Sequence, residues 1–126
     1  MPKKKIMIID DEKYVREAFT ILLRSYSNVQ VIAVGDGQEG FDMAKLAMPD
    51  LIVLDNKMPG IPGEQVARML RADPITKNIP IIMATGMKLD SAEVSLIKLD
   101  VNEYIRKPIN PLDLKRIIED YIGKLE

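Results

Sequence analysis

The strongest constraint on the fold of this sequence is an alternation of short apolar runs with segments of helical spacing. The runs cover residues 6–9, 29–34, 51–54, 79–84 and, more weakly, 102–106. Because the runs are short and show little polar alternation, they are typical of parallel strands that are buried on both faces of a sheet. The alternation therefore predicts an α/β fold, a three-layer doubly wound domain with a five-stranded parallel sheet and five helices.

The segments between the runs carry helix signals, and the expected N-caps are Asp36, Asp90 or Ser91, and Asn110. Pro111 suits the first helical position after Asn110, and Pro49 ends the second helix. The third helix is expected to begin near Glu64. Apolar residues at helical spacing are expected to face the core: Val15, Ala18, Phe19, Leu22, Leu23, Phe41, Ala44, Met48, Val66, Met69, Leu70, Val94, Ile97, Leu114, Ile117, Ile118, Tyr121 and Ile122.

Composition limits the chemistry that the chain can perform. The length of 126 residues suits a single domain over 1–126, and 47% hydrophobic with 29% charged residues is a globular balance. The sequence has no cysteine and no histidine, which excludes disulfides, Ser-His catalysis and most zinc sites. Since no apolar run approaches the length of a membrane span, we expect a cytoplasmic, soluble protein without a membrane partner.

Charge gives no sign of a nucleic-acid binder. The formal net charge is −1, and the one cationic cluster is Lys3-Lys4-Lys5. This cluster directly precedes the first apolar run, so we interpret it as the edge of the first strand and not as a binding patch. We therefore expect no direct contact with nucleic acid.

Polar residues follow four of the five runs: Asp10-Asp11, Asp55, Thr85 and Lys107. Each residue alone has an ordinary interpretation, such as a helix cap, a loop aspartate, a strand threonine or a solvated lysine. In a flavodoxin-like sheet of order 2-1-3-4-5, however, strands one and three are neighbours at the point where the strand order reverses. Because sites in such sheets form at the carboxyl ends of the strands, we expect these residues to converge.

The chemistry of this set indicates a phosphoryl pocket. Three carboxylates in one crevice repel each other unless a cation or a proton joins them. The available ligands are all oxygen atoms, which suits a hard cation such as Mg²⁺. The ammonium of Lys107 and the hydroxyl of Thr85 can each hold a phosphoryl oxygen. The set is therefore consistent with a carboxylate nucleophile that accepts a phosphoryl group.

At these residues the chain resembles the receiver domain of two-component response regulators, the family of the bacterial chemotaxis regulator. The resemblance covers essentially the whole chain. The stretch "IMIIDDE" is similar to the family's first strand and acidic pair, and "PDLIVLDNKMPGIPG" to its phosphoacceptor strand and loop. The stretches "IPIIMATG" and "EYIRKP" resemble its fourth and fifth strands.

The resemblance implies a role for each site residue. Asp55 would be the phosphoacceptor. Asp11 would bind Mg²⁺ directly, Asp55 and the backbone carbonyl of Lys57 would be further ligands, and Asp10 would help to position the metal, largely through water.

The other implied roles concern the phosphoryl oxygens and the switch. Thr85 and Lys107 would hold the phosphoryl oxygens, and Tyr104 would be the aromatic whose rotamer changes on activation. The resemblance also implies a cis peptide bond between Lys107 and Pro108. The sequence departs from the commoner family pattern, and the positions concerned are Lys57, Pro62, Gly86, Met87 and Ile109.

The implied function is a phosphoacceptor switch and not an enzyme that acts on a separate substrate. A sensor histidine kinase or a phosphotransfer protein would donate to Asp55, and the surface of helix four, strand five and helix five would control a downstream protein that the sequence does not name. Three alternatives remain open: a phosphatase with an aspartate nucleophile, a flavodoxin-like cofactor binder, and a receiver used only for binding. The phosphatase would need a second acid where Lys57 stands, and the cofactor binder would need a phosphate-binding loop where Asp10, Asp11 and Glu12 stand.

Overall fold

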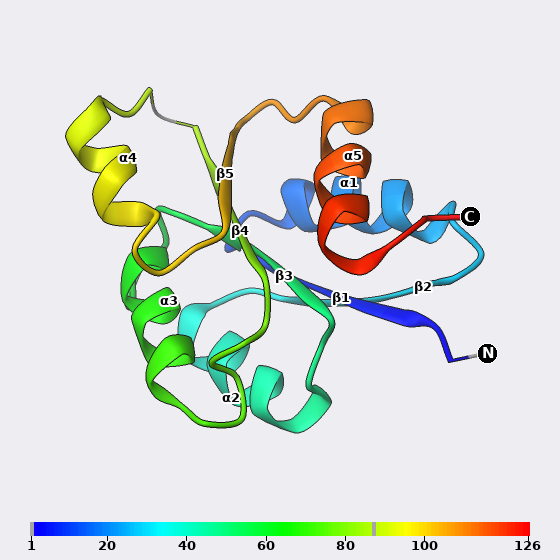
Figure 1. The fold of residues 1–126 in the computed structure, drawn as a ribbon, viewed down its shortest axis with the longest axis horizontal. Coiled ribbons are helices and arrows are strands. Elements are labelled where there is room, and N and C mark those ends of the chain that lie inside the picture. The colour runs from blue at the N-terminus through cyan, green and yellow to red at the C-terminus, as the bar shows by residue number, and fades with distance from the viewer. Residues whose placement is uncertain (1, 87) are drawn as a thin grey trace.

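A computed structural model describes residues 2–86 and 88–126 of the chain. Strands and helices alternate along the whole chain, as the pattern of apolar runs predicts (Figure 1). The elements are β1 (Lys4–Ile9), α1 (Lys13–Arg24), β2 (Val29–Val34), α2 (Gly37–Ala47), β3 (Leu51–Asp55), α3 (Gly63–Ala72), β4 (Ile81–Thr85), α4 (Ser91–Ile97), β5 (Glu103–Arg106) and α5 (Pro111–Ile122).

The five strands form one parallel sheet in the order β2-β1-β3-β4-β5. This arrangement confirms the predicted fold class and strand order. The register sets the ends of the central strands level, because Ile9 pairs with Val34 on one side and with Leu54 on the other. The strand order reverses between β1 and β3, so their carboxyl ends flank the crevice where sites form in sheets of this kind.

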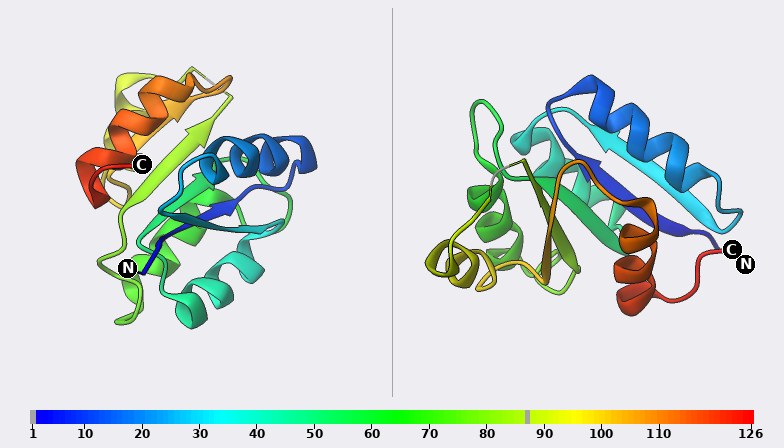
Figure 2. Two further views of the ribbon diagram at one scale, coloured as in Figure 1. Left: turned by 90° about the vertical axis from the view of Figure 1, so that its right-hand side faces the viewer. Right: turned by 90° about the horizontal axis from the view of Figure 1, so that it is seen from above.

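Helices cover both faces of the sheet, as the two views in Figure 2 show. One hydrophobic cluster, named the α1–α5 cluster after the two helices α1 and α5, joins these helices to the sheet and contains Phe19, Leu23, Leu114 and Ile118. The second cluster, named the α2–α4 cluster, joins the opposite face of the sheet to the three helices α2, α3 and α4 and contains Ala44, Val66, Leu70 and Ile97. Neighbouring residues of β1 enter different clusters, which explains why the strands lack polar alternation.

The predicted helix signals are confirmed for three helices. The carboxylate of Asp36 accepts from the amide of Glu39, and Asp90 forms a reciprocal capping box with Glu93. Asn110 accepts from the first amides of α5, where Pro111 occupies the expected position. These caps satisfy amides that have no partner inside their own helices.

Three residues do not lie in the core as the helical spacing predicts. Ala18 is exposed, Tyr121 is 38% exposed, and Met48 is the exposed C-cap of α2. A helix that packs on a sheet buries only the stripe that faces the sheet, so helical spacing alone predicts more buried positions than the structure has. Beyond the end of α5, Leu125 is buried in the α1–α5 cluster instead.

The lysine cluster at the start of the chain supports the first strand. Lys4 donates a hydrogen bond through its Nζ to the carbonyl of Ile122, at the end of α5. Lys5 donates to the carbonyl of Ala47, the last residue of α2, at 3.0 Å. Two of the three lysines therefore attach β1 to helices on opposite faces of the sheet. Across residues 2–86 and 88–126, every helix is too short or too polar to cross a membrane.

Candidate functional site

Three carboxylates meet where β1 and β3 end. Asp55 is the last residue of β3, and Asp10 and Asp11 follow β1 directly. One oxygen from each of the three carboxylates lies within 4.8 Å of the others. Asp10 and Asp55 are buried, whereas Asp11 is partly exposed. The predicted convergence of the acidic residues is thus confirmed, and it creates a strong local excess of negative charge.

Lys107 supplies the opposite charge. Its Nζ lies 2.8 Å from Oδ2 of Asp10 and 3.1 Å from Oδ1 of Asp55. The backbone amide of Lys107 donates to the carbonyl of Thr85 at 2.8 Å, which fixes the chain at the end of β4. The peptide bond between Lys107 and Pro108 is cis, as predicted. One ammonium therefore bridges two of the three carboxylates.

The surroundings shift the proton affinity of both partners. The pKa of Asp55 is raised to about 6. Burial is the largest cause and the charge of Asp10 adds to it, while the hydrogen bond from Lys107 lowers the pKa and offsets part of the rise. Burial alone would lower the pKa of Lys107, but its hydrogen bonds to Asp10 and Asp55, together with the negative charges of these two carboxylates, outweigh burial and raise that pKa. The surroundings of Asp55 thus disfavour its charged form, which a nearby cation would stabilise.

Asp10 is held at every polar atom. Its amide donates to Val34 at 3.2 Å, and its Oδ1 accepts from the amide of Glu12 at 2.9 Å. Its carbonyl accepts from Nη1 of Arg16 at 2.9 Å, and its Oδ2 accepts from Lys107. The interpretation of the acidic pair as a helix cap is wrong, because Glu12 is the N-cap of α1. Sequence reasoning missed the contact of Arg16 with Asp10. The one signal of it in the sequence is a cationic residue in the first turn of the helix that follows the two aspartates.

Gly63 sets the position of the backbone at Asp55. A Cβ atom on Gly63 would lie 2.0 Å from the carbonyl oxygen of Asp55, so no other residue fits here. The amide of Gly63 also donates to the carbonyl of Asn56 at 2.9 Å. The loop after β3 therefore returns so that α3 begins against the end of the strand. Sequence reasoning placed this start one residue later, at Glu64, and gave Gly63 no role.

The remaining predicted site residues lie around this centre. Thr85 is buried at the end of β4, and Tyr104 is half-buried on β5 against the α2–α4 cluster. Lys57 is exposed in the loop after β3. Their predicted roles stay predictions, and Met87 lies outside the described residues.

Besides Lys57, three departures from the commoner family pattern lie among the residues that the structure describes. Pro62 is the N-cap of α3, and it makes no side-chain cap hydrogen bond. A Cβ atom on Gly86 would have open space within 4 Å. Ile109 packs against the α1–α5 cluster.

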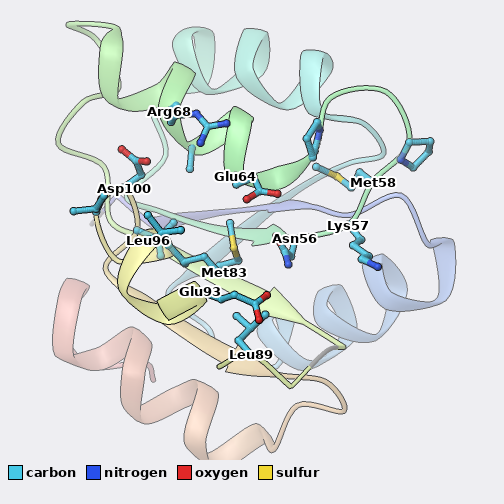
Figure 3. A pocket seen from close by; sticks show the side chains of 16 residues that line it. Asn56, Lys57, Met58, Glu64, Arg68, Met83, Leu89, Glu93, Leu96 and Asp100 are labelled. Atoms are coloured by element: carbon cyan, nitrogen blue, oxygen red, sulfur yellow. The ribbon is translucent and has the colours of Figure 1, made fainter. Parts of the chain in front are cut away.

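A groove adjoins the site on the side of α3 and α4. It has a volume of about 810 Å³ and is lined by the start of the loop after β3, by α3 and by α4. Figure 3 shows Asn56 and Lys57 at one end of this groove, with Leu96 and Asp100 toward the other. Because Asn56 directly follows Asp55, the groove begins beside the carboxylate cluster and continues along α4.

Comparison with known proteins agrees with this site. Residues 6–119 match the family model of the response regulator receiver domain. The chain belongs to this family. This receiver domain therefore carries the family's fold together with an acidic cluster and a lysine at the carboxyl ends of its strands.

The curated relatives of this receiver domain are longer proteins. The probable transcriptional regulator ycf27 of Porphyridium aerugineum is 33% identical over 126 residues, which are 100% of this chain and 51% of the relative. The DNA-binding response regulator MtrA of Mycobacterium tuberculosis is 34% identical over 113 residues, which are 89% of this chain and 47% of the relative. The chain thus spans about half the length of the curated relatives it matches.

Solved structures show the same fold. The receiver domain of a Pseudomonas aeruginosa sensor histidine kinase has a TM-score of 0.87 and 26% identity, covering 97% of this chain and 99% of that one. That structure contains a magnesium ion coordinated in its active site cleft. A putative response regulator of Chloroflexus aurantiacus has a TM-score of 0.86 and 28% identity, covering 95% and 98%. The Vibrio cholerae chemotaxis protein CheY4, at 24% identity over 94% and 98%, shares the fold with a TM-score of 0.87.

Proposed function

We propose that this receiver accepts a phosphoryl group on Asp55 from a phosphohistidine of a partner protein, in a reaction that requires Mg²⁺. The observation that carries the proposal is the position of the Asp55 carboxylate. It ends β3 within 4.8 Å of two further carboxylates, and Lys107 lies 3.1 Å from its Oδ1. A carboxylate beside a fixed ammonium and a potential cation site is suited to nucleophilic attack on phosphorus.

The donor set suits a divalent cation. Its three carboxylates offer oxygen atoms only, which matches the preference of Mg²⁺ for hard ligands. The raised pKa of Asp55 supports this assignment, because a cation would stabilise its charged form. Asp11, Asp55 and the backbone carbonyl of Lys57 would hold Mg²⁺, and Asp10 would act through water. When bound, Mg²⁺ would neutralise the charge that builds up on the transferred group.

The transfer itself would proceed in line. An oxygen of Asp55 forms a bond to phosphorus while the bond from phosphorus to the donor's imidazole nitrogen breaks, and the electron pair stays on that nitrogen. Asp55 then carries an acyl phosphate, and the donor histidine is neutral. The Lys107 ammonium and the Thr85 hydroxyl would each pair with a phosphoryl oxygen. Hydrolysis of the acyl phosphate would restore the Asp55 carboxylate and release inorganic phosphate.

Phosphorylation would change the surface formed by α4, β5 and α5. Lys107 is the first residue after β5, and Figure 1 shows β5 between α4 and α5. The large exposed apolar side chains on these two helices include Leu96 and Leu112, which are 66% and 76% exposed. Thr85 would turn toward the phosphoryl group and Tyr104 would follow it inward, which shifts the population of two states with different affinity for a partner.

The donor and the target are proposed to be proteins. A sensor histidine kinase or a phosphotransfer protein would supply the phosphohistidine, since this sequence contains no histidine. Some relatives are named DNA-binding regulators, but the net charge of −1 and the structural use of Lys4 and Lys5 favour a receiver that does not itself contact nucleic acid. The receiver would act in the cytoplasm as a switch and not as an enzyme with a separate substrate.

Intact-protein mass spectrometry after incubation with acetyl phosphate tests the transfer. Wild type should gain one phosphoryl group when Mg²⁺ is present and none after chelation. Asp55→Asn should gain none under either condition. Asp50→Asn is a matched control, because Asp50 precedes the same strand and binds the amide of Lys5 away from the cluster. Equal labelling of Asp55→Asn and wild type would overturn the assignment.

The switch has a separate test. Phosphorylated wild type should show NMR shift changes at Tyr104 and along α4 and α5, compared with unphosphorylated protein. Thr85→Ala should still accept phosphoryl on Asp55 but should lose most of these changes. Full shift changes in phosphorylated Thr85→Ala would contradict the proposed path from Thr85 to Tyr104.

A further inference from the structure

Arg16 makes a contact with the acidic site that its charge alone does not explain. It lies in the first turn of α1, and its Nη1 donates at 2.9 Å to the backbone carbonyl of Asp10, not to a carboxylate. The carbonyl of Asp10 belongs to the planar peptide unit that joins Asp10 to Asp11. A hydrogen bond to this oxygen therefore fixes the orientation of the plane from which Asp11 continues.

This restraint matters because the two aspartates are held differently. Both carboxylate oxygens of Asp10 accept hydrogen bonds, from the amide of Glu12 and from Lys107. Asp11 is partly exposed, yet one of its carboxylate oxygens lies within 4.8 Å of the oxygens of Asp10 and Asp55. The backbone that carries Asp11 therefore helps to set the direction of this side chain toward Asp55, and Arg16 holds that backbone.

Gly35 leaves room for the guanidinium of Arg16. A Cβ atom on this glycine, which follows β2, would lie 3.2 Å from Nη1 and 3.5 Å from Cζ of Arg16. The guanidinium thus lies against a position that has no side chain. It connects the end of β1 with the residue after β2, next to the point where the amide of Asp10 donates to the carbonyl of Val34.

We propose that Arg16 is a positioning residue for the divalent cation, and that it acts by fixing the Asp10–Asp11 peptide so that Asp11 faces Asp55. The proposal rests on the proposed function, because it assigns Asp11 as a direct ligand. The proposal does not require Arg16 to contact the cation. Residues that orient metal ligands commonly change metal affinity by about ten- to a hundredfold when they are replaced.

A charge effect and a positioning effect have opposite signs here. Arg16 is a cation near an acidic site, so as a point charge it would repel Mg²⁺, and its removal would tighten Mg²⁺ binding. As a positioning residue it would favour Mg²⁺ binding, and its removal would weaken that binding. The sign of the change in Mg²⁺ affinity therefore decides between the two.

The first experiment titrates Mg²⁺ into Arg16→Met and follows backbone NMR shifts at Asp11 and Asp55. We expect about tenfold weaker Mg²⁺ binding than in wild type. Arg24→Met is the matched control, since it makes the same change at the exposed end of the same helix, and it should bind Mg²⁺ like wild type. Unchanged or tighter binding by Arg16→Met, or an equal loss in Arg24→Met, would overturn the proposal.

Gly35→Ala is a second variant that keeps the charge of Arg16 and places a Cβ atom 3.2 Å from its Nη1, so that the guanidinium has to shift slightly. It should weaken Mg²⁺ binding to a smaller extent than Arg16→Met, and it carries the test if Arg16→Met does not fold. Mg²⁺ affinity equal to that of wild type would overturn the role given to Gly35, and in the absence of folded Arg16→Met it would overturn the whole proposal.

Hydrogen exchange in metal-free protein separates this inference from the proposed function. The amide of Glu12 donates to Oδ1 of Asp10, so it reports the order of this turn without any Mg²⁺. Its exchange should be faster in Arg16→Met than in wild type and unchanged in Arg24→Met. Equal protection in all three proteins would overturn the positioning role, even if wild type binds Mg²⁺ and accepts phosphoryl on Asp55.

Discussion

The ammonium of Lys107 lies 3.1 Å from a carboxylate oxygen of Asp55, although β4 separates the two strands that end beside these residues. The lysine side chain therefore extends past the end of β4 to reach Asp55. In doing so it also contacts Asp10, on the strand beyond Asp55, at 2.8 Å. One long side chain thus connects the edge of the sheet to both strands of the central crevice. Its ammonium lies where the proposed phosphoryl group on Asp55 would be bound.

Lys107→Met should destabilise the metal-free receiver and tighten its Mg²⁺ binding. The buried carboxylates of Asp10 and Asp55 would lose their ammonium, and breaking a buried ion pair on one side costs about 3–5 kcal/mol. Because Lys107 is 17% exposed, we expect about 2–4 kcal/mol, measured by urea unfolding with chelator at neutral pH. Mg²⁺ should then bind more tightly, since a competing cation is absent.

Lys45→Met is the control for this comparison. Lys45 forms a more exposed ion pair with Asp73, at 3.5 Å, and pairs of this kind contribute about 1 kcal/mol or less. Equal losses in the two variants would show that the Lys107 bridge contributes no more than a surface pair.

Asp55→Asn should stabilise the metal-free receiver above pH 6. The pKa of Asp55 is raised from 3.8 to about 6, so the folded state binds this proton more tightly than the unfolded state does. Its contribution to stability is present at low pH and is lost as pH rises from about 4 to about 6. The amide does not titrate, so the variant should gain about 1–3 kcal/mol at pH 7 relative to wild type.

Urea unfolding of both proteins at several pH values, with chelator present, gives the difference that decides this prediction. Other carboxylates titrate in both proteins and cancel in that difference. The gain of Asp55→Asn should disappear toward pH 4 and should shrink when Mg²⁺ is added to wild type. A difference that does not vary with pH would mean that burial of Asp55 does not disfavour its charged form.

The fold was predictable because its signals are local and repeated. Buried runs such as Leu51–Asp55 carry no polar alternation, and side-chain caps such as Asp36 stand at their expected places. The width of each buried helical stripe was not predictable in the same way. Tyr121 follows the spacing of the core positions on α5, yet it is 38% exposed, because burial depends on the neighbouring elements as well as on helical spacing.

The acidic site was predictable from strand ends, whereas its supporting contacts were not. Asp10, Asp11, Asp55 and Lys107 each follow an apolar run, so the topology alone brings them together. Gly63 depends on a close approach between two backbones that are adjacent in space. No periodicity or composition signals such a contact, and the same holds for distant partners such as those of Arg71, which donates to the carbonyls of Ile79 and Asp100.

Met48→Gly should stabilise the receiver without affecting the site. Met48 ends α2 in the left-handed region, with φ 47 and ψ 63, and its side chain is 62% exposed. Glycine adopts this conformation without the penalty that a side chain carries, and it is the usual residue here. We expect a gain of about 0.5–1 kcal/mol in the free energy of unfolding, measured by urea titration. Leu46→Gly, an exposed change inside the same helix, should instead lower stability by about 1 kcal/mol.

Gly63→Ala should be among the most damaging single-methyl changes in this chain. The added Cβ would lie 2.0 Å from the carbonyl oxygen of Asp55 and 2.9 Å from its carbonyl carbon, and both are backbone atoms that cannot rotate away. Either α3 or the end of β3 must move, so we expect a loss of more than about 3 kcal/mol by urea unfolding. Gly86→Ala tests the opposite case beside the same site, because its Cβ would have no neighbour within 4 Å. That variant should keep its stability within about 0.5 kcal/mol of wild type. Folded Gly63→Ala should also bind Mg²⁺ more weakly, since the displaced strand end carries Asp55. Wild-type stability and Mg²⁺ affinity in Gly63→Ala would refute the view that α3 begins where it does because only glycine fits against Asp55.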